Sequence, residues 1–312
     1  MGCPDWPKCF GLYSPPGCEC QLPHNYQQIF LEKRIAKAER FAKILDKLGM
    51  TEKAKLIRED EKIYVPEEFN VAKAWTEYIN RIFGVISGLL ALAFFVMAFL
   101  GRFSAKTKMF ATFGFLMLVG NAWLGSIVVA TNLLPGIVTL HFLLSFLCAF
   151  FFLLAMHSNA PFTRENMSKG DRTKWIFMFV LVMAEVFLGT LARESVEYMK
   201  TAGALTGKGG MLDYNNMGIN FAIHRFLPGA ILILSLYFGI MRRREGRGIL
   251  NDFNILAIMV LIQICLGAIN IVVVLPAYAQ VLHILIGSIM PVYCFYKWLQ
   301  SNSGILLIPS KP

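Results

Sequence analysis

The sequence predicts an all-α membrane protein built as two tandem repeats of a four-helix bundle. Three observations lead to this fold class. The 312 residues are 56% hydrophobic and only 16% charged, which is too apolar for an ordinary soluble domain. Seven apolar runs reach the length of about 20 residues that crosses a bilayer. Polar and glycine positions of the earlier runs recur at matching spacing in the later runs, as expected of a duplication.

The seven apolar runs begin near residues 81, 109, 137, 175, 220, 253 and 279. They divide the chain into three predicted segments: an extracytoplasmic cysteine-containing loop and helical cap at 1–74, an N-terminal half-bundle at 75–160, and a C-terminal four-helix bundle at 161–312. The second repeat has an extra helix, expected from about Lys174 to Ala192. The first repeat has no equivalent, so we expect that an eighth, N-terminal spanning helix is missing from this sequence.

The net charge of +10 indicates membrane orientation rather than nucleic-acid binding, because no aromatic-basic module accompanies it. The short loops Gly101 to Lys108 and Met241 to Gly248 are basic, whereas the turns Thr131 to Gly136 and Leu275 to Gln280 are uncharged. Basic short loops face the cytoplasm. The sequence therefore predicts a multi-pass protein of the bacterial plasma membrane with residues 1–74 on the extracytoplasmic side.

The predicted extracytoplasmic segment contains four cysteines: Cys3, Cys9, Cys18 and Cys20. Disulfides persist outside the cytoplasm. The first two could bridge, but the other two compete as partners, and sequence does not fix the connectivity.

A charged stretch from Gln28 to about Glu61 has apolar residues at helical spacing, with Gly49 as a stop signal. It predicts a helix or a helical pair. This part is either a solvated cap over the bundle or a docking surface for a partner enzyme.

Two pairs of polar residues open apolar helices at matching spacing. Asn80 precedes His141 by 61 residues, and His224 precedes His283 by 59. A Leu-Gly-small-Ile pattern lies ahead of both His141 and His283, with its glycine 16 residues before each. One helix intervenes within each pair, so both members run in the same direction. We expect the two side chains of a pair to lie at equal depth near the extracytoplasmic end.

Two imidazoles at equal depth on parallel helices can take both axial positions of one haem, with each ring nitrogen about 2 Å from the iron. We therefore predict that His224 and His283 bind one haem and that His141 binds another. A single histidine near a helix end is usually interfacial, but repetition at matched spacing favours ligation. Arg81 and Arg225 follow the key positions and either pair with haem propionates or anchor the helices at the interface.

Glu77 makes the two predicted pockets chemically unequal. It stands three residues before Asn80, on the same helical face, whereas the second repeat has Phe221 at the matching place. An ionisable group beside a membrane-embedded pocket is a functional candidate. One pocket then has two histidines, and the other has an acid, Asn80 and one histidine, His141.

Motifs from both repeats, in order and over nearly the whole chain, resemble haem A synthase. They are Gly2-Cys3-Pro4-Asp5-Trp6-Pro7-Lys8-Cys9, Trp75-Thr76-Glu77-Tyr78-Ile79-Asn80-Arg81, the block from Leu124-Gly125 to His141, Ile223-His224-Arg225, and Leu282-His283.

The resemblance implies eight spanning helices in two halves and oxidation of the C8 methyl of haem O to the formyl of haem A, for terminal oxidases. It implies a b-type haem cofactor, with its iron on His224 and His283, the substrate haem near His141, and Glu77 as the catalytic acid residue. Many members carry histidine where this sequence has Asn80. Because an amide is a poor iron ligand, we expect His141 to hold the substrate iron alone or with water.

Two other classes of function fit the sequence less well than this oxidase. A non-catalytic dihaem cytochrome b carrier would need haems at different depths, and all four positions lie at one end. A transporter built from repeats would need broken helices with polar residues near the midplane. The expected partners are haem O, membrane lipid, an electron donor and haem O synthase. Nucleic acid is not expected, and self-association into a homo-oligomer stays open.

Overall fold

The computed structural model describes residues 2–3, 5, 7–47, 49–66, 68–131, 136–159, 169–201, 217–246 and 248–301. Within these ranges the regular structure is helical, and seven helices are long and apolar enough to cross a membrane. The predicted class, an all-α multi-pass membrane protein, is therefore confirmed. The chain forms two compact units, Met1–Ala155 and Met156–Pro312, and each is described by itself.

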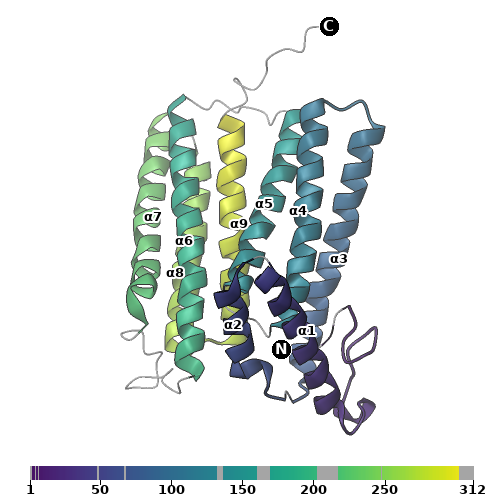
Figure 1. The fold of residues 1–312 in the computed structure, drawn as a ribbon. Helices are drawn as coiled ribbons and strands as arrows, with labels where there is room; N and C mark the ends of the chain where they lie inside the picture. Colours follow the sequence, from purple (N-terminus) through teal and green to yellow (C-terminus); the bar gives the residue numbers. More distant parts are fainter. Residues whose placement is uncertain are drawn as a thin grey trace. The chain divides into compact units, whose positions relative to one another are not determined.

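The first unit joins a helical hairpin to three long apolar helices (Figure 1). Its helices are the 3-10 turn η1 (Glu19–Gln21), α1 (Tyr26–Lys47), α2 (Thr51–Glu59), the 3-10 turn η2 (Glu61–Ile63), α3 (Val71–Leu100), α4 (Ala105–Ala130) and α5 (Ile137–Asn159). The predicted helical pair is confirmed as α1 and α2. Gly49 lies between them at φ 76°, a left-handed conformation that glycine adopts without strain. Most of the predicted turn from Thr131 to Gly136 lies outside the described residues.

The α1–α2 hairpin has its own apolar core and a charged latch. The core contains Ala42, Leu45, Ala54, Ile57 and Ile63, all buried. In the latch, Arg58 on α2 donates hydrogen bonds to Glu39 at 3.0 Å and to Asp46 at 2.8 Å, both on α1. The hydrogen bond from Arg58 holds the pKa of Glu39 below its usual range, and the two carboxylates raise the pKa of Arg58.

Helix α3 begins before the predicted half-bundle boundary at residue 75 and ten residues before the apolar run near residue 81. It starts at Val71 because the Asn70 side chain accepts a hydrogen bond from the Lys73 amide at 2.9 Å. Such a cap satisfies one of the free amides at a helix start. The apolar run near residue 81 shows where the part of α3 that can enter a membrane begins. The Asn70 cap shows where the helix itself begins. Asn80 therefore lies inside α3.

Aromatic and small side chains join α3, α4 and α5. Phe94 on α3 packs edge-on against Phe152 on α5, with ring centroids 5.7 Å apart, and Phe113 on α4 stacks on Phe151 at 5.6 Å. Close packing of this kind holds membrane helices together where lipid gives no hydrophobic driving force.

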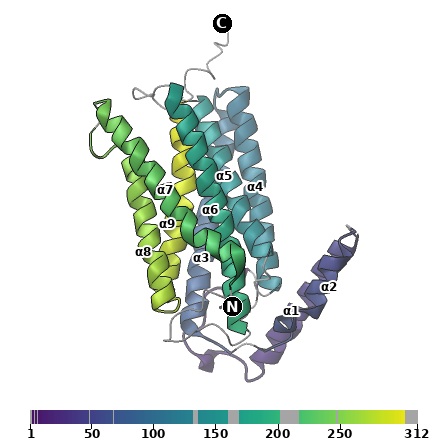
Figure 2. The same ribbon diagram turned by 90° about the vertical axis from the view of Figure 1, so that its left-hand side faces the viewer.

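The second unit is a four-helix bundle. Its helices are α6 (Lys169–Thr201), α7 (Gly218–Arg244), α8 (Asp252–Val272) and α9 (Ala277–Ser301). Helix α6 extends beyond both predicted ends, Lys174 and Ala192. Neighbouring helices are α6 and α7, α7 and α8, α8 and α9, and α9 and α6, so α7 and α9 are diagonal. Figure 2 shows α7 bending along its length, as expected of a helix with an internal proline, Pro228.

Buried aromatic and ionic contacts fix the bundle. Trp175 on α6 stacks on Phe253 on α8 at 4.2 Å between ring centroids. At the end of α7, Arg242 donates to the fully buried Asp171 on α6 at 2.9 Å. Arg242, although part of the basic stretch Met241 to Gly248, therefore joins two helices through a buried ion pair. Arg247 of the same stretch lies outside the described residues.

A tight turn connects α8 to α9. Val274 and Leu275 have φ of 54° and 61°, a left-handed conformation that is unfavourable for non-glycine residues, above all β-branched ones. The Leu275 amide donates to Asn270 at 2.8 Å, and its carbonyl accepts from the Gln280 side chain at 2.5 Å. These bonds fix the start of α9.

Candidate functional site

Two histidines face each other across the second bundle. His224 on α7 and His283 on α9 each lie six residues after the first residue of their helix, which is about 9 Å along the axis at 1.5 Å per residue. Their ring centroids are 6.2 Å apart, and the ring planes are nearly perpendicular at 89°. The two imidazoles are therefore level and close together, at the end of the bundle opposite Arg242.

This separation suits one iron atom between the rings. With each ligating nitrogen about 2 Å from the metal and about 1.2 Å from its ring centre, two axial imidazoles have centroids about 6.4 Å apart. Two glycines on the same helices leave room around them: no heavy atom lies within 4 Å of a Cβ position on Gly229, and Gly287 has only the Gln263 side chain near that limit, at 3.8 Å. The residues present fit a haem.

Within the described ranges, no group of three or more His, Cys, Asp or Glu could hold a metal ion by itself. A haem does not require such a group, because the porphyrin supplies the remaining iron ligands. The pair His224 and His283 is thus suited to a haem rather than to a bare metal ion.

Each of the three predicted ligands packs against a glycine of the preceding helix. A Cβ atom placed on that glycine would approach Cε1 of the imidazole. The pairs are Gly125 with His141 and Gly189 with His224, both at 3.1 Å, and Gly267 with His283 at 3.7 Å. The first two distances are shorter than ordinary van der Waals contact, so a side chain there would displace the ring.

A polar residue four positions before each glycine contacts the same histidine. The Asn121 backbone carbonyl accepts from Nδ1 of His141 at 3.1 Å, Oε1 of Glu185 lies 2.6 Å from Nδ1 of His224 as an ion-pair contact, and Nε2 of Gln263 donates to the His283 backbone carbonyl at 3.0 Å. Positions four apart share one helix face. In His141 the hydrogen bond, and in His224 the ion-pair contact, involves Nδ1 and leaves Nε2 as the nitrogen that can bind a metal.

Glu185 is a site residue that the sequence reasoning missed. The sequence Leu188-Gly189-Thr190 is similar to the glycine patterns ahead of His141 and His283. The signal was present: Asn121, Glu185 and Gln263 each precede their glycine by four residues. A ligating histidine normally gives its second ring nitrogen to such a partner, and a carboxylate is a common one.

The first unit has a less complete arrangement. His141 is half-buried near the start of α5, and Asn80 is exposed on α3. Gly84 and Gly88, one and two turns beyond Asn80, have no heavy atom within 4 Å of their Cβ positions, which leaves an open strip on α3. The roles of Asn80 and His141 toward a second haem stay predictions.

Glu77 and Arg81 lie together in the first turns of α3. Arg81 donates to Glu77 at 2.5 Å, and both side chains bind backbone groups of residues 2–8. Arg225, the matching arginine of α7, is exposed, with its guanidinium carbon 5.7 Å from the centre of the Phe226 ring. The propionate contacts expected for Arg81 and Arg225 stay predictions, as does the catalytic role of Glu77.

Fold and site together define a class: a polytopic all-α membrane protein whose helical bundle carries a matched histidine pair near one end. The particular family follows from comparison with known proteins. A model of the cytochrome oxidase assembly protein family (COX15-CtaA) matches residues 46–293. Because this range is most of the chain, the protein belongs to that family, and the resemblance found in the motifs is confirmed at that level.

No curated protein and no solved structure matches the chain. The matched range contains all seven spanning helices except the last turns of α9. It begins after the four cysteines of the N-terminal segment.

Proposed function

We propose that this protein is a haem A synthase, which oxidises the C8 methyl of haem O to the formyl of haem A. The observation that carries the proposal is the 6.2 Å separation of the His224 and His283 rings, in a member of a family that assembles cytochrome oxidase. Haem A is a prosthetic group that such an oxidase requires.

His224 and His283 would hold a b-type haem as resident cofactor. When bound, this group supplies one-electron chemistry at a potential set by its axial ligands. The protein's own part is to fix the two imidazoles: Glu185 orients His224 through Nδ1, and Gln263 ties the His283 backbone to α8. A membrane redox partner would exchange electrons with this half of the protein.

His141, Asn80 and Glu77 would serve the substrate haem O. His141 offers Nε2 to the substrate iron because its Nδ1 is bound to the Asn121 carbonyl. Asn80 is a poor ligand, so one axial position stays open to water. Conversion of a methyl to a formyl group with oxygen from water releases four protons and four electrons. The membrane redox partner would take the electrons, and Glu77 is the acid–base residue that would accept a proton.

The proposal is tested by expressing the chain together with a haem O synthase and analysing the extracted haems by pyridine haemochrome spectra and chromatography. Haem A, or hydroxylated haem O, is expected to accumulate. Unmodified haem O with haem b alone would overturn the proposal and favour a non-catalytic dihaem carrier.

A Glu77→Ala variant tests the acid. It should keep the haem b of the second unit and lose most haem A formation, since a positioned acid–base group typically contributes about 10²–10⁴-fold. Haem A formation at the normal rate would remove Glu77 from its proposed role.

A further inference from the structure

The chain from Cys3 to Cys9 forms a closed loop, which we name the disulfide ring. The sulfur atoms of Cys3 and Cys9 are bonded, and both residues are buried. Two ring residues also bond to the chain that follows the ring: Asp5 accepts a hydrogen bond from the Gly11 amide at 2.9 Å, and the backbones of Cys9 and Leu12 pair at 2.9 and 3.1 Å. These bonds hold the ring to the turn after it.

Phe10 anchors the disulfide ring to the first unit. Its side chain packs edge-on against Tyr26 and Phe30 of α1 and against Phe69, with ring centroids 6.1, 5.2 and 5.1 Å away. Edge-to-face pairs of this kind are favourable arrangements of aromatic rings. A covalent closure and an aromatic anchor therefore fix where the backbone of the ring can lie.

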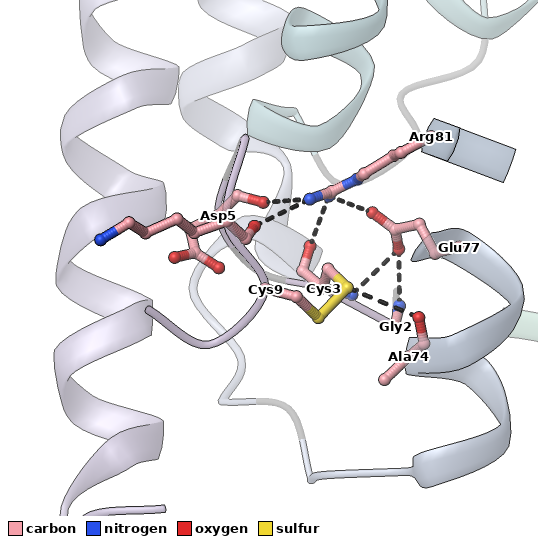
Figure 3. A network of polar contacts seen from close by, with 8 residues as sticks. Gly2, Cys3, Asp5, Cys9, Ala74, Glu77 and Arg81 are labelled. Atoms are coloured by element: carbon pink, nitrogen blue, oxygen red, sulfur yellow. Dashed lines mark hydrogen bonds and ion pairs between the residues drawn. A yellow bond between two sulfur atoms is a disulfide. The ribbon is translucent and has the colours of Figure 1, made fainter. Parts of the chain in front are cut away.

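Three carbonyl groups of the disulfide ring surround the Arg81 guanidinium (Figure 3). Nη1 donates to the carbonyls of Asp5 at 2.7 Å and Lys8 at 2.8 Å, and Nη2 donates to the Cys3 carbonyl at 3.4 Å. The side chain is only 12% exposed. A guanidinium has five N–H donors in a fixed plane, so these bonds fix its direction as well as its place.

The Glu77 carboxylate is bound from two sides by the same structure. Oε1 accepts from Arg81, and Oε2 accepts from the amides of Gly2 at 2.8 Å and Cys3 at 3.0 Å. Every one of these donors belongs either to the chain at the ring or to the arginine that the ring holds. An isolated Glu–Arg pair one helix turn apart would be exposed and only weakly ordered.

We propose that Arg81 is a positioning residue: the disulfide ring fixes Arg81, and Arg81 together with the Gly2 and Cys3 amides fixes the carboxylate of Glu77. This inference rests on the proposed function, in which Glu77 is the acid–base residue. The ring precedes the range matched by the family model, whereas Glu77 and Arg81 lie within it. The contacts of Arg81 and Glu77 therefore join a segment outside the matched range to residues inside it.

The test compares four proteins with the native one: Arg81→Gln, Arg81→Lys, the ring-opened double variant Cys3→Ser with Cys9→Ser, and the combination of Arg81→Gln with the opened ring. The matched control opens the other disulfide, Cys18–Cys20, which lies outside the disulfide ring. Haem b content reports the integrity of the second unit in each protein.

The first measurement does not depend on activity. Glu77 in detergent-solubilised protein is labelled with a water-soluble carbodiimide and an amine, and the labelled peptide is quantified by mass spectrometry. The labelling rate should rise severalfold in Arg81→Gln and in the ring-opened variant, change little in the Cys18 and Cys20 control, and rise no further in the combination. Non-additivity shows that the two changes act through one path.

The second measurement is the rate of haem A formation. Arg81→Gln and ring opening should each lower kcat by about 10- to 100-fold, as expected of a displaced catalytic group, with Arg81→Lys intermediate and haem b content unchanged. Additive losses, or a labelling rate that ring opening does not alter, would overturn the proposal. If the ring-opened protein does not fold, the two Arg81 variants decide, and a Glu77 labelling rate that Arg81→Gln leaves unchanged would overturn the proposal. If the native protein makes no haem A, the proposed function fails, and the labelling experiment still decides whether ring and Arg81 hold Glu77.

Discussion

The two units have chemically different residues at matching positions of the sequence repeat. In the second, His224 is preceded at three residues by Phe221, which is buried among Ala192, Met199 and Met217. In the first, Asn80 is preceded at three residues by Glu77, which is hydrogen-bonded to Gly2, Cys3 and Arg81. One position is thus a strong metal ligand beside an apolar cluster, and the other is a weak ligand beside an acid.

This difference teaches how a duplicated bundle can separate two tasks. Two strong axial ligands and an apolar surrounding favour permanent retention of a prosthetic group. A single imidazole, an open strip along α3 and a fixed carboxylate favour a bound molecule that reacts and leaves. Under the proposed function, the second unit holds the cofactor and the first holds the substrate.

The largest expected effect comes from replacing a predicted ligand histidine in each unit. His283→Ala should lower the haem b retained by purified protein to below about a tenth, because it removes one of the two side chains that would ligate the iron. His141→Ala should retain that haem and lose haem A formation. Absorption spectra of the reduced proteins and haem-to-protein ratios measure this, and equal loss of haem b in both variants would contradict the division between the units.

A second experiment sharpens the role of Glu185. Glu185→Gln should weaken haem b retention by about 10- to 100-fold, the usual effect of removing the partner of a ligating histidine, and should raise the reduction potential because a negative charge near the iron is lost. Redox titration and haem loss to apomyoglobin measure both. Asn121→Ala is the matched control, since His141 is bound by the Asn121 backbone carbonyl. An unchanged potential in Glu185→Gln would show that the contact is not used.

A smaller effect is expected from the glycines that face the imidazoles. Gly189→Ala places a methyl group 3.1 Å from His224, whereas Gly267→Ala places one 3.7 Å from His283. The first should displace its ring by a few tenths of an ångström and reduce haem b retention severalfold, and the second should behave like the native protein. If Gly267→Ala were the more damaging variant, the histidine geometry described for α6–α9 would be wrong.

The smallest effect concerns the α1–α2 hairpin of the first unit. Because Arg58 lowers the pKa of Glu39, their contact contributes stability that is fully present above the ordinary pKa of 4.5 and is lost as the pH falls through the lowered value. Acidification from neutral pH to about 3 should therefore loosen the hairpin slightly. Arg58→Gln should show little of this pH dependence. Hydrogen exchange of α1 and α2, corrected for intrinsic rates, measures the change, and an equal response in both proteins would assign the loosening to other carboxylates.

The sequence was sufficient for the spanning helices and for the meeting of His224 with His283, because apolar length and matched spacing are local properties of the chain. It misplaced the start of α3, since the Asn70 cap depends on one hydrogen bond and not on hydrophobicity. The contacts of Arg81 could not be predicted, because its partners lie more than seventy residues away and only the folded disulfide ring brings their carbonyls together. Glu185 was predictable in principle, from a polar residue repeated four positions before each glycine.

Helix α3 runs without interruption from Val71 to Leu100. Glu77 and Arg81, in its first turns, therefore share one continuous helix with Gly84 and Gly88, in the apolar part that follows. Under the proposed function, a change in the disulfide ring that displaces the first turns of α3 would also move the open strip at these glycines, since no break in the helix separates the two.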